Sequence, residues 1–323
     1  MTIPRLGIGF LGFPDLRSLV DAGRAAEAAG FESAWVAETR LTRDAVTGVT
    51  ALLLATKRMR VGSAAINVFT RGAALVAVTW ATLSEAAPGR AVLGLGVGSE
   101  GPLARQGYSV DHPVGRLRDF VAALRAAWAS SGPVSIRQGH VRFESLQLEV
   151  RPAEPPPIYL CVGGPRALTL AGQIGDGVVL DAFLPPSFAA NARGLLDAGA
   201  ADGRFGGEVA GAVVVSISDN REAAAAPLKR LLAGYLVGFP ELARISGVDP
   251  ELVERLRARS AADGIEAAAS LVSSELVAAH ALCGTAGACR ERLGEYRSAG
   301  YELPVLFPVP GSLDACIRDL AGA

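Results

Sequence analysis

Eight short runs of apolar, often β-branched residues recur along this chain of 323 residues, separated by amphipathic stretches. Most runs are continuously apolar rather than alternating, which is typical of parallel strands buried on both faces. The runs are Arg5–Phe10, Ser33–Glu38, Met59–Ile66, Ala91–Gly98, Pro157–Gly163, Gly177–Phe183, Val209–Ile217 and Leu303–Val309. This alternation predicts an α/β fold built on a parallel sheet.

The stretches between the runs carry helix signals. The clearest helix is Pro113–Ser130, whose apolar side chains fall on one face and whose proline suits a first helical turn. Asp15–Ala29 and Ala73–Glu85 have the same character, and Gly30 is expected to end the former. Eight strands separated by helices predict a (β/α)8 TIM barrel, with an open doubly wound sheet as the alternative.

Two segments interrupt the regular alternation. Val134–Val150 is expected to form an inserted hairpin that turns at Gln138-Gly139. Leu228–Ala281 is helical, alanine-rich and too long for one barrel helix, so we expect it to cover the mouth of the barrel. Residues 1–323 are therefore interpreted as one barrel domain with a hairpin at about 134–150 and a helical insertion at about 228–281.

Composition narrows the class of partner. Lysine plus arginine (31) nearly equal aspartate plus glutamate (32), with no basic stripe, so no nucleic-acid partner is expected. No long apolar stretch predicts a membrane span, and the first residues resemble a strand more than a signal peptide. Four cysteines without CxxC spacing and three histidines predict no metal site and a reduced, cytoplasmic setting.

The glycine run Gly94-Leu95-Gly96-Val97-Gly98 allows two interpretations. A dinucleotide-binding fingerprint needs a strand, glycines that open a helix, and an acid on the next strand. Here the next long helix begins only at about Pro113. We therefore favour glycines at the end of a barrel strand that let a loop or ligand approach the backbone.

Three stretches resemble the luciferase-like flavin superfamily, and most of all its branch with the coenzyme F420-dependent methylenetetrahydromethanopterin reductases. They are GFESAWVAETRLTRD (Gly30–Asp44), RVGSAAINVFTRGAALVAVTWATLSEAAPGRAVLGLGVGS (Arg60–Ser99) and PIYLCVGGPRALTLAGQIGDGVVLDAF (Pro157–Phe183). The segment Gly284–Pro310 is similar to the family's closing helix and strand. The resemblance implies a barrel, often a homodimer, that binds coenzyme F420 or FMN and a small-molecule substrate.

The residues expected at the site follow the strands, because the ligand chemistry of such barrels lies on the loops after the strands. Gly163 and Gly164 precede a helix whose free N–H groups suit a phosphate, and the resemblance implies contact with the cofactor's tail there. Arg166 either adds a charged contact or lies in solvent. Ala64 and Ala65 stand where the resemblance implies a cis peptide in a bulge behind the cofactor ring.

Polar residues beyond the bulge have two possible roles. The segment NVFTR is similar to the family's NPYTR, which implies that Asn67 binds the pyrimidine edge of the ring. The alternative is a structural segment in which Thr70 caps the helix that follows. Ser99 is also expected to contact the cofactor.

Glu38 is the first candidate acid. The resemblance implies an acid followed by a histidine here, but in this chain Thr39 replaces the histidine. We expect Thr39 to contact the cofactor. A carboxyl group at a strand end in the barrel mouth can have a raised pKa and donate a proton. Glu38 could instead pair with Arg40 or Arg43. Glu100 is a second candidate acid.

The leading hypothesis is a coenzyme F420-dependent oxidoreductase that transfers a hydride to or from a C=N, C=C or C=O group. An FMN-dependent monooxygenase is the second hypothesis. The third is a non-redox barrel protein that has lost the family's histidine, since a fold by itself does not fix a function.

Overall fold

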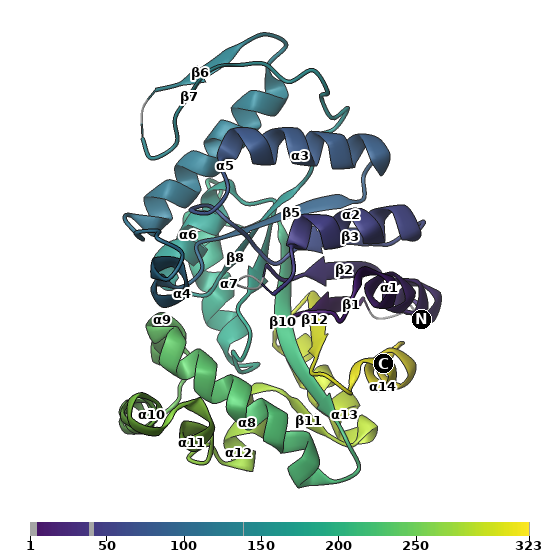
Figure 1. The fold of residues 1–323 in the computed structure, drawn as a ribbon, viewed down its shortest axis with the longest axis vertical. Helices are drawn as coiled ribbons and strands as arrows, with labels where there is room; N and C mark the ends of the chain where they lie inside the picture. Colours follow the sequence, from purple (N-terminus) through teal and green to yellow (C-terminus); the bar gives the residue numbers. More distant parts are fainter. Residues whose placement is uncertain (1–4, 39–41, 138, 323) are drawn as a thin grey trace.

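The computed structural model describes residues 5–38, 42–137 and 139–322, and its centre is a closed barrel of parallel strands (Figure 1). In order around the barrel the strands are β1 (Gly7–Phe10), β2 (Ser33–Val36), β3 (Arg60–Ser63), β5 (Ala91–Gly96), β8 (Ile158–Val162), β9 (Gly177–Leu180), β10 (Glu208–Ile217) and β12 (Leu303–Pro308). Pairing of β9 with β10 and of β12 with β1 closes the ring. Each predicted run overlaps one of these strands, so the predicted TIM barrel is confirmed and the open sheet is wrong.

Helices surround the barrel on its outside. They are α1 (Leu16–Ala29), α2 (Ala45–Ala55), α3 (Ala73–Ala86), α5 (Pro113–Ala129), α6 (Pro165–Ile174), α7 (Phe188–Gly199), α13 (Ala286–Ala299) and α14 (Leu313–Leu320). Gly30 ends α1 in the left-handed region, as predicted. At the other end, the Asp15 carboxylate caps the helix by accepting a hydrogen bond from the Ser18 N–H.

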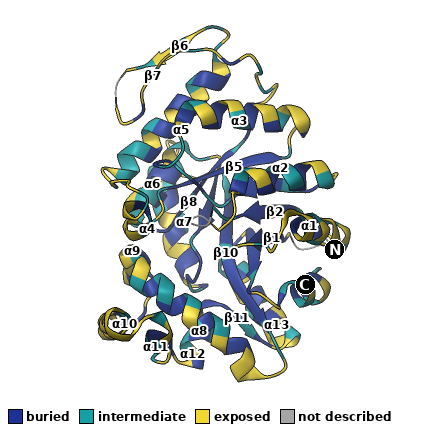
Figure 2. Cartoon of the chain, in the orientation of Figure 1, coloured by how far each residue is buried: buried dark blue, intermediate teal, exposed yellow. Residues whose placement is uncertain are grey.

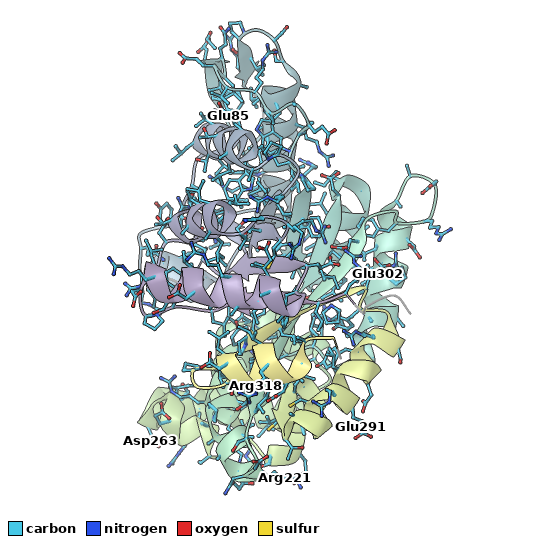
Figure 3. All side chains as sticks on the ribbon, turned by 90° about the vertical axis from the view of Figure 1, so that its right-hand side faces the viewer. Glu85, Arg221, Asp263, Glu291, Glu302 and Arg318 are labelled. Carbon is cyan, nitrogen blue, oxygen red and sulfur yellow. The ribbon has the colours of Figure 1, made fainter. Side chains whose placement is uncertain are left out.

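The interior of the barrel is packed with side chains rather than open. A cluster of buried residues points inward from the strands, with Trp35, Tyr159 and Phe307 as its largest members. A second, larger cluster lies between the strands and the surrounding helices. Figure 2 shows the strands as the buried centre, with exposed residues on the outer faces of the helices. Charged side chains such as Glu85 and Asp263 project from that outer surface (Figure 3).

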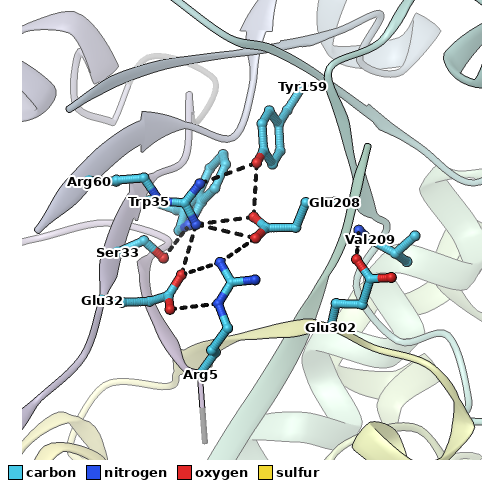
Figure 4. A network of polar contacts seen from close by, with 9 residues as sticks. All are labelled: Arg5, Glu32, Ser33, Trp35, Arg60, Tyr159, Glu208, Val209 and Glu302. Carbon is cyan, nitrogen blue, oxygen red and sulfur yellow. Dashed lines mark hydrogen bonds and ion pairs between the residues drawn. The ribbon is translucent and has the colours of Figure 1, made fainter. Parts of the chain in front are cut away.

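A network of charged groups closes the end of the barrel where the strands begin (Figure 4). Arg5 donates to Glu32 at 2.6 and 2.7 Å, and Arg60 donates to Glu32 at 2.8 Å. Arg60 also pairs with Glu208 at 3.2 Å, and the Tyr159 hydroxyl donates to the same carboxylate at 2.9 Å. These side chains fill the barrel interior at this end, whereas the ligand chemistry of such barrels lies at the opposite end, where the strands finish.

The helical insertion begins earlier than predicted. It consists of α8 (Arg221–Gly238), α9 (Pro240–Ile245), α10 (Pro250–Asp263), α11 (Ile265–Ala269) and α12 (Ser274–His280). The sequence boundary at Leu228 is wrong because Asn220 caps α8, accepting a hydrogen bond from the Ala223 N–H at 3.0 Å. The insertion packs its own apolar core onto Phe183 and Val214 of the barrel. A short strand, β11 (Leu282–Gly284), then pairs with β10 and was not predicted.

The inserted hairpin is present as the antiparallel strands β6 (Val134–Ile136) and β7 (Phe143–Leu146). The hairpin and the helical insertion lie at opposite ends of the long axis in Figure 1. Gln138, half of the predicted turn, lies outside the described residues, and its neighbour Gly139 has a positive φ of 82°. Across the described part of the chain, no helix has the length and apolar character that a membrane span needs.

Candidate functional site

A cavity of about 1040 Å³ opens where the strands end, opposite the charged network. Its wall is built from segments that follow β2, β3, β5 and β9, together with the short helix α4 (Glu100–Ala104), α8 and the residue that links α8 to α9. Five site residues predicted from the sequence line it: Glu38, Ala64, Ala65, Asn67 and Ser99. The barrel therefore brings together residues that are up to 61 positions apart, as expected of loops at one rim.

The floor of the cavity is a bulge between β3 and the two-residue strand β4 (Ile66–Asn67), with a cis peptide between Ala64 and Ala65. Glycines of β5 make room for this bulge. A Cβ atom on Gly94 would lie 1.8 Å from the Ser63 carbonyl oxygen, and one on Gly96 would lie 3.1 Å from the Ala65 Cβ. Side chains at these two positions would push the bulge away from β5.

The same spacing continues one step further along the chain. Gly98 has a φ of +65°, and a Cβ there would lie 2.5 Å from Asn67 Nδ2. The glycines at 94, 96 and 98 thus face the residues at 63, 65 and 67, in that order. The preferred interpretation, close approach of a loop to a barrel strand, is confirmed. The dinucleotide-binding interpretation is wrong, because β5 belongs to a closed barrel and its glycines pack against the bulge.

Three polar side chains border the floor. Asn67 Oδ1 accepts hydrogen bonds from the Phe69 and Thr70 N–H groups at 2.8 and 3.3 Å, which leaves its Nδ2 amide as the donor that can face a ligand. Thr70 does not cap α3: the N-cap is Gly72, so the predicted capping role is wrong. Among the described residues, the buried hydroxyls of Thr70 and Ser99 have no hydrogen-bond partner.

These two hydroxyls test whether a ligand fits. A buried hydroxyl left without a partner costs roughly 1–3 kcal/mol. A polar ring edge lying on the floor would supply the missing partners, while the small side chains of Ala64 and Ala65 leave its flat face unobstructed. The residues present therefore fit a planar ring that has a polar rim.

Glu38 lies in the wall and is held by a partner that the sequence pattern did not identify. Arg71 Nε donates to both Glu38 oxygens at 3.1 and 3.3 Å, and its Nη2 pairs with Asp44, the N-cap of α2. Burial raises the pKa of Glu38, although Arg71 opposes the shift. Arg43 instead donates to the carbonyl groups of Phe13 and Pro14, so the predicted Arg43 pairing is wrong.

Two more residues predicted in the loop after β2, Thr39 and Arg40, lie outside the described residues. Thr39 is expected to contact the cofactor, and Arg40 is a possible partner of Glu38. Arg71, in the segment between β4 and α3, takes the place of Arg43 as the partner of Glu38. Glu38 and Arg71 are 33 positions apart along the chain.

Glu100 does not border the cavity among the residues that the structure describes. It is exposed in the first turn of α4. The adjacent Ser99 is the residue that turns inward, because Ser99 is the extended N-cap of α4 and Glu100 already follows the helix.

The Gly163-Gly164 turn leads into α6 as predicted, with Gly164 as the N-cap, and Arg166 is exposed in the first turn. The insertion covers this turn. A Cβ on Gly163 would lie 3.1 Å from Ile245 Cδ1, and one on Gly164 would lie 3.2 Å from Glu241 Oε1. The turn therefore has a carboxylate beside it as well as helix N–H groups.

Asp181 follows β9 and lines the cavity, although it was not among the site residues predicted from the sequence. Burial raises the pKa of its carboxyl group to about 6. The signal for it was its place near the end of the predicted strand Gly177–Phe183, at the rim where the other site residues lie. The described residues include no group of three or more histidine, cysteine, aspartate or glutamate side chains placed to hold a metal ion.

An aromatic wall, formed by Phe183, Tyr235 and Phe239, faces the cavity from the side of the insertion. The rings of Tyr235 and Phe239 stack at 5.1 Å, and Phe183 meets Tyr235 edge-on at 5.1 Å. Tyr235 and Phe239 line the cavity directly. No local sequence pattern predicts this wall, because it depends on how the insertion folds back over the barrel.

Comparison with known proteins agrees with this geometry. Over 298 residues the chain is 27% identical to 5,10-methylenetetrahydromethanopterin reductase of Methanolobus tindarius, with 91% of each chain covered. Coenzyme F420-dependent tetrahydromethanopterin reductase from Methanopyrus kandleri superimposes with a TM-score of 0.85 at 21% identity, covering 98% of both chains. An F420-dependent secondary alcohol dehydrogenase superimposes with a TM-score of 0.78 at 21% identity, covering 98% of this chain and 99% of that one. Residues 4–303 match the luciferase-like monooxygenase family, and the chain belongs to this family.

Proposed function

We propose that the protein is a coenzyme F420-dependent oxidoreductase that transfers a hydride between the deazaflavin and a small organic substrate with a C=N, C=C or C=O group. The observation that carries the proposal is the cavity floor, where small side chains lie beside two buried hydroxyls that have no hydrogen-bond partner among the residues the structure describes. Sequence similarity to an F420-dependent glucose-6-phosphate dehydrogenase, across half of this chain, supports the choice of cofactor.

In this proposal the chain's own residues bind and orient the ring. Asn67 Nδ2, Thr70 Oγ1 and Ser99 Oγ offer polar contacts to its rim, and Ala64 and Ala65 support its face. The Gly163-Gly164 turn and α6 offer N–H groups to the phosphate of the tail. When bound, the reduced deazaflavin supplies the hydride.

Exclusion of water and supply of a proton complete the role of the protein. The aromatic wall covers the cavity on the side of the insertion, which strengthens polar interactions inside it. Glu38 is a candidate proton donor, because burial favours its neutral form. The same carboxyl group also pairs with Arg71. Glu100 is exposed, and it enters the proposal only as a group at the rim.

Equilibrium binding of both cofactors tests this proposal. We expect F420 to bind at micromolar concentration, read by quenching of its fluorescence, and FMN, read by visible absorbance, to bind more weakly. Ala64→Leu places a larger side chain on the floor and should weaken F420 binding about tenfold or more, which corresponds to roughly 1.4 kcal/mol. The same change at Ala25, exposed on the outside of α1, is the matched control.

Three outcomes would separate the hypotheses. Tight FMN binding without F420 binding would favour a flavin monooxygenase and refute the proposal. Binding of neither cofactor would favour a non-redox barrel protein. Equal loss of F420 binding in the Ala64→Leu and Ala25→Leu variants would show that the floor does not hold the ring.

The assembly and cellular setting are part of the same proposal. We propose a homodimer that acts in the cytoplasm on a small molecule, as the family resemblance implies. Exposed apolar side chains on α2 and α3, namely Leu54, Leu75 and Val78, support a second copy as the partner of this surface. Light scattering that gives the mass of one chain would refute the dimer.

A further inference from the structure

We propose that Asp181 exchanges the proton with the substrate, and that the substrate is an amine or imine with an apolar or aromatic body, so that the bond oxidised or reduced is a carbon–nitrogen bond. This inference rests on the proposed function, and it names the substrate class of the same cavity.

The first observation is that Asp181 lines the cavity and has no counterion among the described residues. It extends from the end of β9 into the cavity wall, close to Gly163, where a Cβ would lie 2.8 Å from Asp181 Oδ2. Among the described residues no hydrogen bond or ion pair holds this carboxylate. The other two acids of the wall, Glu38 and Asp44, share Arg71. Among the acids of the described wall, Asp181 is therefore the one with which a bound cation would pair.

The second observation is the surroundings of Asp181. The thiol of Cys161 lies on β8 beside it, and the phenol of Tyr301 comes from the segment before β12. Glu241 of α9 stands over the adjacent Gly164. Burial raises the pKa values of Cys161 and Tyr301, and the charge of Asp181 adds to this effect. Both groups therefore stay protonated and uncharged at neutral pH.

The third observation is the apolar remainder of this part of the cavity. Tyr235 and Phe239 of the aromatic wall line it, together with Phe307 and Leu231. An organic ammonium or iminium group gains from a carboxylate and from nearby aromatic rings, which attract cations by about 0.5–2 kcal/mol. An anionic substrate would meet the unpaired carboxylate and be repelled. The arrangement thus favours a cationic nitrogen attached to an apolar body.

In the direction of reduction, the imine nitrogen takes the proton of the Asp181 carboxyl group, which leaves an iminium ion paired with the carboxylate. The iminium carbon then accepts a hydride, which the reduced deazaflavin would supply when bound. The electron pair of the C=N π-bond moves to nitrogen, so that one N–H and one C–H bond have formed. The substrate is reduced and the deazaflavin oxidised by two electrons, and Asp181, left as a carboxylate, regains its proton from water. Burial, which raises the pKa of Asp181 to about 6, suits a group that gives and takes a proton near neutral pH.

Calorimetric binding of two probes tests the inference. The amine is 2-phenylpyrrolidine and its uncharged counterpart is phenylcyclopentane, each titrated into protein with and without F420. We expect the amine to bind about tenfold or more tightly than the hydrocarbon, as charge-assisted hydrogen bonds predict. Amine affinity should rise as pH increases through about 6, because Asp181 then loses its proton while the amine stays charged.

Asp181→Asn should remove both the preference for the amine and its pH dependence. Asp21→Asn is the matched control, because Asp21 is a largely exposed acid on α1. Asp181→Asn that binds the amine as tightly as the unchanged protein would overturn the inference, and so would equal binding of the two probes by the unchanged protein. The pH profile of the unchanged protein decides the question even if Asp181→Asn fails to fold.

The two proposals fail in different ways. If the unchanged protein does not bind F420 but prefers the amine, the proposed function falls and the role of Asp181 in binding cations stands. If F420 binds to both proteins and the amine preference survives in Asp181→Asn, only the inference about Asp181 falls.

Discussion

Glu241 gives a sharp test of the Gly163-Gly164 turn as the phosphate site. Its carboxylate lies beside Gly164, within 3.2 Å of where a Cβ would stand. Hydrogen bonds from Arg244 hold the pKa of Glu241 below its usual range, so it is ionised at neutral pH. A phosphate bound at this turn would therefore lie close to a negative charge. Glu241→Gln removes that charge and should tighten F420 binding.

The magnitude follows from the position of the side chain. Two unit charges about 4 Å apart in water repel by about 1 kcal/mol. Glu241 is half exposed, so the value for water applies. A change of about 1 kcal/mol is roughly a fivefold gain in affinity. In 1 M salt the gain should largely vanish, because the screening length there is about 3 Å.

Fluorescence quenching at low and high salt provides the assay. Glu85→Gln is the matched control: Glu85 is an exposed acid in the last turns of α3, at the end of the barrel where the strands begin. A deazaflavin without its phosphate-bearing tail should bind equally to all variants. If Glu241→Gln binds F420 within twofold of Glu85→Gln, or tightens the tail-less ring by as much, the turn does not hold the phosphate.

Two further predictions concern stability. Gly94→Ala should lower the free energy of unfolding by more than about 3 kcal/mol, because the new Cβ would lie 1.8 Å from the Ser63 carbonyl oxygen. Gly194→Ala should raise it by up to about 1 kcal/mol, because Gly194 lies within α7 and a Cβ there would meet no other atom. Equal midpoints of thermal unfolding for the two variants would contradict this. Tyr301→Phe should leave the free energy of unfolding unchanged or raise it, because the buried Tyr301 hydroxyl has no partner in the described structure. Tyr296→Phe should lower it by about 1 kcal/mol, because the Tyr296 hydroxyl loses its 3.1 Å hydrogen bond to the Leu184 carbonyl oxygen. Urea denaturation that ranks the two variants in the opposite order would refute these hydrogen-bond roles.

Much of the site could be predicted because it follows the strands directly. Ala64, Ala65, Asn67 and Ser99 lie at strand ends, and the carboxyl ends of parallel barrel strands meet at one rim whatever their separation along the chain. Asp181 has the same local signal, yet only its burial and its lack of a counterion in the described part of the chain distinguish it from an ordinary surface acid.

Other parts of the site had no local signal. Arg71 approaches Glu38 from the segment between β4 and α3, and α9 covers the Gly163-Gly164 turn because the insertion folds back over the barrel. Two residues that lie near site residues along the chain do not take part in the site as predicted. Arg43 donates to the carbonyl group of Phe13, and Glu100 is exposed to solvent.

The amino-acid sequence by itself determined the eight buried strands, their alternation with helices, and the glycine spacing at Gly94, Gly96 and Gly98. These features depend on periodicity and on the size of single residues, which are local properties. Only the tertiary structure decided which charges are paired and which carboxyl group of the cavity has no partner within residues 5–38, 42–137 and 139–322. Pairing and burial depend on distances between segments far apart in the chain, and the chemistry of Glu38 and Asp181 follows from those distances.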